Sequence, residues 1–462
     1  MPEHCCQLAS ITKHQRPQIS FKHLETNMHS SNQPSRSGAR RKLEMMVLLS
    51  FPLTFTPGCG EKDLPEVRQT PERPLGELRL AMRKQKWSEA WQYSDAVLKA
   101  HPDDADAIAS VAKVAQHLEK PNEVADLLVK ACSVESFSND GRVRQAMIAL
   151  VGAGRLYDAI DLLENTIQAV PSRHATRRWL YDLYINSGNR AEALPHGRTL
   201  VRQRQFDTKL LLSLGIPPSA KDDLGSTLEI VRRNPDDKRP LLRQANKLLN
   251  SGDIEEATKV LQQITDQHPE FEPAQLLHGL ALAGSGDIDA YEQWLSEQDV
   301  SSLETSVEYW IAKATIAAAE EDSKDALRFY WNASQLNPDL TKPWSSILEL
   351  TEELAIDAPE RLDAISNRLE SLQQIRSSME RFDQMGSISR RLATDIAIEL
   401  EKLGRLWEAE AWASIAMTLP RDDTVDVEGV RAKIVTQLTG QTPWQVTEGR
   451  PELQSELPNE LQ

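Results

Sequence analysis

Apolar residues recur at helical spacing from about residue 74 to residue 420, in stretches that short polar turns separate. Many stretches follow one pattern, in which a turn residue precedes a bulky apolar residue, two variable positions and Ala, and the helix ends near Pro. The segment Gly252-Asp-Ile-Glu-Glu-Ala257, which leads to Pro269, is one example. Gly favours a helix end because it adopts the left-handed conformation, and Pro does not continue a helix. The pattern predicts short antiparallel helices joined by tight turns, and hence an all-α fold.

The pattern repeats with a period of about 34 residues. Positions 90 and 124, 159 and 193, and 257 and 291 are each 34 residues apart, while positions 124 and 159, and 291 and 326, are 35 apart. The longer intervals, from 193 to 257 and from 326 to 409, leave room for further units. A fixed period of this length is the mark of a repeat protein, in which each unit buries its apolar face against its neighbours.

The repeated positions resemble those of the tetratricopeptide repeat (TPR) family, whose unit is a helix–turn–helix of 34 residues. The resemblance covers roughly Pro74 to Pro420. Small residues lie where the two helices of a unit cross: Ala112, Gly279 and Ala314 on first helices, and Ala90, Ala159, Ala193, Ala257, Ala326 and Ala409 on second helices. Glycines lie at the ends of first helices: Gly152, Gly154, Gly188, Gly252, Gly286 and Gly404.

The resemblance implies a right-handed superhelical α-solenoid whose first helices line a concave groove. Such grooves generally bind peptides, partner proteins or other helices, so the expected function is binding. Two segments depart from the family pattern and are predicted to be irregular: 201–235, which contains Gly215-Ile-Pro-Pro218, and 354–388, which contains one long helix from Pro359 to about Asp383. After the solenoid, at 74–420, we expect a capping helix at 421–438 and a disordered tail at 439–462.

The charge of the chain is unevenly distributed. The 462 residues carry a formal charge of −16, yet residues 1–58 hold seven basic and three acidic residues, so the remainder carries −20. Arg40, Arg41 and Lys42 precede an apolar run that is too short to span a membrane. A basic region followed by a short apolar region is typical of a secretory signal, here at 45–58.

Cys59 directly follows a small residue, which resembles the lipobox of bacterial lipoproteins. The resemblance implies that Cys59 is the lipid attachment site, although Thr56 stands where the family usually has Leu and Pro57 is unusual. A plain signal, a short anchor and a chance apolar patch are the alternatives. Residues 1–44 form a polar leader that is either disordered or not translated, and we favour a later start. Residues 59–73 are predicted to be a flexible linker.

The chain carries no sequence motif for a nucleotide, a metal or a catalytic nucleophile, so we expect no enzyme activity, no cofactor and no metal site. The acidic balance argues against nucleic acid as a partner. Within the expected groove, however, the repeat phase places a set of cations, with Glu72, Asp106 and Asp182 opposite them. This set would favour binding of an acidic peptide or a C-terminal carboxylate. The alternative is that these cations form a solvated helix face. The set consists of Arg79, Arg83, Lys113, Arg144 and Arg178.

The sequence therefore predicts a non-enzymatic scaffold that binds a partner protein or peptide. With the lipoprotein signal, its expected location is the membrane of a bacterium, at the periplasmic face of the cell envelope, where only the lipid anchor contacts the membrane. A cytoplasmic location is the alternative. Two other functions stay open: an accessory module of a larger redox, transport or assembly complex, and an enzyme whose site lies in the irregular segments.

Overall fold

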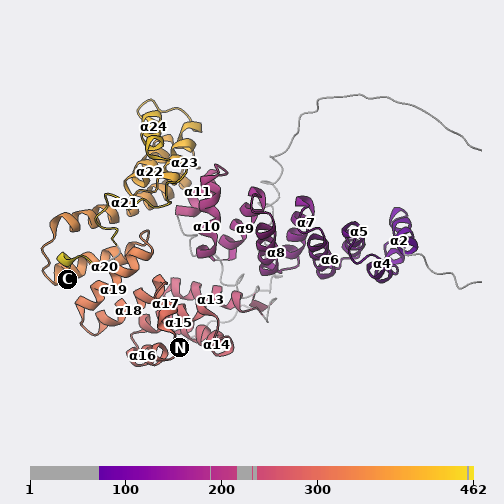
Figure 1. Cartoon of the computed structure of the whole chain (residues 1–462), viewed down its shortest axis with the longest axis horizontal. Coiled ribbons are helices and arrows are strands. Elements are labelled where there is room, and N and C mark those ends of the chain that lie inside the picture. Colours follow the sequence, from indigo (N-terminus) through magenta and orange to yellow (C-terminus); the bar gives the residue numbers. More distant parts are fainter. Residues whose placement is uncertain (1–71, 188, 216–230, 233–236, 455–456, 462) are drawn as a thin grey trace, which may run out of the picture. The chain divides into compact units, whose positions relative to one another are not determined.

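The computed structural model describes residues 72–187, 189–215, 231–232, 237–454 and 457–461. The polar leader, the signal segment with Cys59 and most of the linker lie outside these residues, as do Gly188 and much of 201–235. Every regular element of the described part is a helix (Figure 1). Within that part, no helix has both the length and the apolar character needed to cross a membrane.

Most helices before the gap at 216–230 pack against the next helix in chain order (Figure 1). The two short helices at 87–91 and 94–100 instead both pack on the helix before them and on the helix after them. Short turns connect the two helices of a pair, which run antiparallel. These helices are α2 (Glu72–Arg83), α3 (Trp87–Trp91), α4 (Ser94–Ala100), α5 (Ala105–His117), α6 (Pro121–Val134), α7 (Asp140–Gly152), α8 (Leu156–Ala169), α9 (His174–Ser187), α10 (Arg190–Arg202) and α11 (Thr208–Gly215).

The helices after the gap continue the same arrangement, which confirms the predicted all-α solenoid of helix pairs. Helix α21 is the expected long helix of the segment 354–388, and α24, inside the segment 421–438, packs on α22 and α23. These helices are α13 (Lys238–Ser251), α14 (Ile254–Gln267), α15 (Glu272–Ser285), α16 (Ile288–Ser296), α17 (Val300–Leu303), α18 (Val307–Ala319), α19 (Ser323–Leu336), α20 (Thr341–Glu353), α21 (Pro359–Gln384), α22 (Arg390–Lys402), α23 (Leu406–Thr418) and α24 (Val427–Gln437), followed by a short 3₁₀ helix, η1 (Asn459–Leu461).

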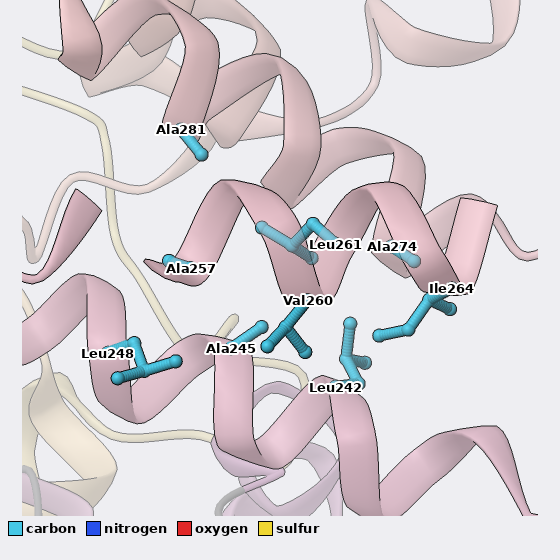
Figure 2. Packing of buried hydrophobic residues seen from close by; sticks show 9 residues of the cluster. All are labelled: Leu242, Ala245, Leu248, Ala257, Val260, Leu261, Ile264, Ala274 and Ala281. Carbon is cyan, nitrogen blue, oxygen red and sulfur yellow. The ribbon is translucent and has the colours of Figure 1, made fainter. Parts of the chain in front are cut away.

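The core between α13, α14 and α15 shows how neighbouring helices bury one another (Figure 2). Leu242, Ala245 and Leu248 follow one another at three-residue spacing and therefore share a face of α13. They pack against Val260 and Leu261 of α14, and Ala274 and Ala281 of α15 complete the cluster. Because no pair buries its apolar face alone, the stack of units is the stable structure.

The turn between the helices of a pair has a recurrent left-handed residue. Gly154, Gly252, Gly286 and Gly404 have φ angles between +76° and +86°, as expected for glycines that end a first helix. The equivalent position is not always glycine: Gln85, Glu119 and Glu321 adopt the same region of φ. A repeat search that requires glycine there would miss three of the turns.

The pair formed by α15 and α16 accommodates a bulky residue where Ala is usual. Tyr291 is buried on α16, and its ring lies 5.5 Å from that of Trp294. Gly279 on α15 faces this indole so closely that a Cβ atom there would overlap it. Because Gly279 has no side chain, the indole of Trp294 fits against α15. Helix α16 is also shorter than the second helices of the neighbouring pairs.

The C-terminal segment corrects one expectation, because residues 439–454 and 457–461 pack on the solenoid instead of being disordered. The indole of Trp407 donates to the carbonyl of Thr442 at 2.8 Å, and that of Trp331 donates to the carbonyl of Gln454 at 3.1 Å. Trp444 and Leu453 are buried. The segment was predicted to be disordered because its composition is polar and its buried apolar residues are widely spaced. Side chains of the solenoid donate hydrogen bonds to backbone carbonyl groups of the segment.

Cys132 on α6 is a buried thiol, as expected of a core residue, and burial raises its pKa to about 12. Since the thiolate is the reactive form, we expect Cys132 to resist alkylation by iodoacetamide at pH 8 in the folded protein. Mass spectrometry of the peptide that contains it should show modification only after denaturation. Rapid modification of the native protein at pH 8 would contradict this packing.

Candidate functional site

A large groove lies over the first three helix pairs. It has a volume of about 1090 Å³ and is formed by α2, α5, α6 and α7. First helices supply most of its walls, as the sequence predicted for the ligand-binding face. Its lining residues are Arg79, Met82, Asp106, Ala109, Ser110, Ala112, Lys113, Gln116, Glu119, Lys120, Pro121, Val124, Leu128, Gln145, Ile148, Ala149 and Gly152.

Helical spacing explains why these side chains share one groove. Ser110, Lys113 and Gln116 follow one another at three-residue intervals, so they form one ridge along α5. Gln145 and Ile148 have the same spacing on α7. Because α5 and α7 are the first helices of neighbouring units, their ridges border the same groove.

The bottom of the groove is apolar. Alanines at positions 109, 112 and 149 contribute only methyl groups, which keeps the groove open. Ile148 is 49% exposed and adds a large apolar side chain to this surface. Val124 and Leu128 of α6 extend the apolar surface. The groove therefore offers apolar surface together with polar side chains of α2, α5 and α7.

The charges at the groove are unequally compensated. Asp106 is neutralised by Arg142, whose Nη2 atom lies 2.7 Å from its Oδ1 atom. Lys120 pairs with Glu123 at 3.4 Å and lies 4.5 Å from the centre of the Trp91 ring. Arg79 and Lys113, by contrast, have no ion pair among the described residues. Two cations are thus available to a ligand, and Glu119 is the remaining acid of the lining.

The structure brings together only two of the five cations that the sequence placed in the groove. Arg79 and Lys113 line it, whereas Arg83 is exposed at the end of α2 and is outside the lining. Arg144 is half-buried and also outside the lining, because the groove face of α7 passes through the next residue, Gln145. The expected set of five is therefore not a single cluster.

Arg178 is held by acids instead of facing a ligand. Its Nε atom lies 3.3 Å from a carboxylate oxygen of Asp182, and its Nη1 atom lies 3.1 Å from Asp207. Asp182 was expected to oppose the cations across the groove, but it lies one helical turn after Arg178 on the same helix. The i,i+4 spacing of the two residues is the sequence signal for this pair.

The groove residues that were not singled out from the sequence include Gln116, Gln145 and Ile148. Gln116 follows Lys113 by one helical turn, and this spacing was the signal that could have found it. The exposure of Ile148 had no sequence signal, because an apolar residue on a helix is ordinarily assigned to the core. The predicted repeat phase was also displaced by one residue on α7, so the sequence placed Arg144 where the structure has Gln145.

In the described ranges, no group of three or more His, Cys, Asp or Glu side chains is arranged to hold a metal ion. Gln116 and Gln145 carry amides, which donate and accept hydrogen bonds but do not titrate. The groove is therefore equipped for hydrogen bonding, charge pairing and apolar contact.

No family model matches the chain, and no curated protein matches it. Among solved structures, the chain is similar to a tetratricopeptide repeat protein from Parabacteroides merdae (12% identity, 62% of this chain and 99% of that chain, TM-score 0.25). It is also similar to the P58(IPK) TPR domain (13%, 79% and 98%, TM-score 0.23) and to yeast Tom70 (12%, 80% and 88%, TM-score 0.27). The TM-scores of these likenesses are low.

Proposed function

We propose that the protein is a non-enzymatic scaffold that holds an extended, acidic peptide segment of a partner protein in the groove of α2, α5, α6 and α7. The observation that carries this proposal is the combination of two unpaired cations, Arg79 and Lys113, with the exposed apolar side chain of Ile148. An acidic side chain of the ligand would pair with the cations, and an apolar one would cover Ile148.

An extended peptide could form hydrogen bonds with the polar side chains of the groove. The backbone of an extended segment exposes unpaired N–H and C=O groups, and the amides of Gln116 and Gln145 both donate and accept hydrogen bonds. The groove also spans helices of three successive units, so it accommodates several residues in a row. Because charge pairing contributes, binding should weaken as the salt concentration rises.

We further propose that the scaffold acts at the bacterial cell envelope, held to a membrane by a lipid on Cys59. The basic residues before the apolar run, and the cysteine after it, support this address. Mass spectrometry of the N-terminus of the protein purified from membranes tests it. A diacylated peptide that begins at Cys59 would support the proposal, and an intact Met1 would overturn it.

The groove is tested by peptide selection followed by charge reversal. Peptides selected on the full chain from a random display library should be acidic and should contain an apolar residue. Arg79→Glu and Lys113→Glu together are expected to weaken their binding roughly tenfold or more, because both reversals replace attraction with repulsion. Fluorescence anisotropy with labelled peptides measures the change.

A matched control separates the groove from the overall charge. Lys259→Glu and Arg328→Glu make the same change of net charge on α14 and α19, where both side chains are exposed. This variant should bind the peptides as the wild type does. Equal loss in both variants, or no loss in the groove variant, would contradict the proposed site.

A further inference from the structure

A second, smaller cavity lies where the last helices before the gap meet helices from the C-terminal part of the chain. Helix α11 contacts α21 and α23, and α10 contacts α23. The cavity between them measures about 120 Å³, which is several times the space that one water molecule needs. Arginine side chains dominate its polar lining: Arg190, Arg198, Arg376 and Arg405, with Asp339 and Trp444 beside them.

The positive charges at this cavity exceed the negative ones. Arg405 pairs with the buried carboxylate of Glu408, and its Nη1 atom lies 3.4 Å from Asp339. These two acids are shared among three guanidinium groups, because Arg190 and Arg198 also face the cavity. Arg376, on the exposed side, adds a further positive charge.

A third acid near the cavity is already paired. Glu452 lies 3.3 Å from Arg368, a neighbouring guanidinium that is itself buried. The backbone carbonyl groups of Ser213 and Leu214 accept hydrogen bonds from Arg190 but carry no charge. Burial lowers the pKa values of Arg190 and Arg198, because nearby acids do not compensate for the loss of water.

Several polar atoms of the cavity wall have no hydrogen-bond partner in the described part of the chain. Three are donors: the Nε atoms of Arg198 and Arg405 and the Nε1 atom of Trp444. One is an acceptor, Oδ1 of Asp339. Buried polar atoms are nearly always paired, so a ligand with acceptors for three donors and at least one donor of its own fits these walls.

We propose that this cavity binds inorganic phosphate in its hydrogen phosphate form. The charged oxygens would accept from Arg198, Arg405 and Trp444, and the hydroxyl group would donate to Asp339. Phosphate suits the excess of positive charge, and guanidinium groups bind its oxygens well. Sulfate has the same shape and charge but lacks the hydroxyl donor, so it should bind more weakly.

The bound ion would hold three segments of the chain together. Arg198 belongs to α10, Arg405 directly precedes α23, and Trp444 belongs to the C-terminal segment. The guanidinium of Arg198 lies 5.3 Å from the centre of the Trp444 ring, so the two side chains are already adjacent. Phosphate would therefore stabilise the folded chain and not only fill a space.

The test is isothermal titration calorimetry of the full chain with inorganic phosphate, with thermal unfolding followed at matched ionic strength. Phosphate should bind saturably and raise the melting temperature above that in chloride. O-Phosphoserine carries the same group on a body too large for the cavity and should not bind. Equal effects of chloride and phosphate would overturn the proposal, and binding of O-phosphoserine would overturn the assignment to the free ion.

Variants locate the site. Arg198→Gln should reduce phosphate affinity roughly tenfold or more, because it removes one charge and one donor. Arg202→Gln, an exposed position one turn later on α10, is the control and should bind like the wild type. If Arg198→Gln does not fold, Trp444→Phe keeps the ring and removes only the indole donor. Unchanged affinity in the folded variants would contradict the site.

Discussion

Replacing Glu452 with Ala is expected to lower the free energy of unfolding by about 3–5 kcal/mol. The carboxylate of Glu452 is buried and lies 3.3 Å from Nη1 of Arg368, which is 2% exposed. Removal of the acid leaves a guanidinium group in the interior with only Asp339, at 4.0 Å, as a counter-charge. Chemical denaturation of the full chain measures the effect.

The exposed Glu448 of the same segment provides the control. Glu448→Ala should leave stability unchanged within about 0.5 kcal/mol, as for most surface substitutions. Limited proteolysis should then cleave the C-terminal segment of the Glu452→Ala variant faster than that of the control. Equal stability and equal cleavage of the two variants would contradict the docking of this segment on the solenoid.

Replacing Glu408 with Ala is expected to have a similar cost, about 3–5 kcal/mol. Glu408 is completely buried on α23, and its carboxylate accepts from Arg405, whose side chain is 8% exposed. Without Glu408, Asp339 is the nearest remaining acid to Arg405, at 3.4 Å. Urea unfolding of the purified variant measures the loss.

A double variant tests whether the cost arises from the uncompensated charge. Arg405→Met with Glu408→Leu removes both members of the pair and replaces them with apolar side chains of similar size. Such replacements are often neutral or stabilising, so the double variant should be more stable than Glu408→Ala alone. If the double variant is as unstable as the single variant, packing and not charge explains the effect.

The sequence predicted the helix pairs well because their determinants are local. The 34-residue period, the left-handed glycines such as Gly252 and the apolar spacing on α13 and α14 each act within one unit. Interactions between segments that are distant in the sequence could be identified only from the structure. The contact of Arg368 with Glu452 joins residues 84 positions apart, and no periodic pattern marks it. The docking of the C-terminal segment was missed for that reason.

The candidate groove was predicted in part. Its location on the first helices followed from the repeat phase, and Arg79 and Lys113 line it as expected. Arg178 was misplaced because its partner Asp207 comes from the next unit, a contact that needs the packed structure. Arg144 differs from the lining residue Gln145 by one position, which is a rotation of about 100° on a helix of 3.6 residues per turn. A phase error of this size is enough to move a charge out of a site.

The central claim is that a partner occupies the groove of α2, α5, α6 and α7, and site-specific photocrosslinking tests it most directly. A photoreactive phenylalanine analogue replaces the exposed Ile148 in one variant and the exposed Val435 of α24 in the control. After irradiation of cells that express the full chain, a discrete adduct should form at position 148, should be lost when Arg79 and Lys113 are reversed to Glu, and should be absent at position 435. Adducts at both positions alike, or none at position 148, would contradict the account.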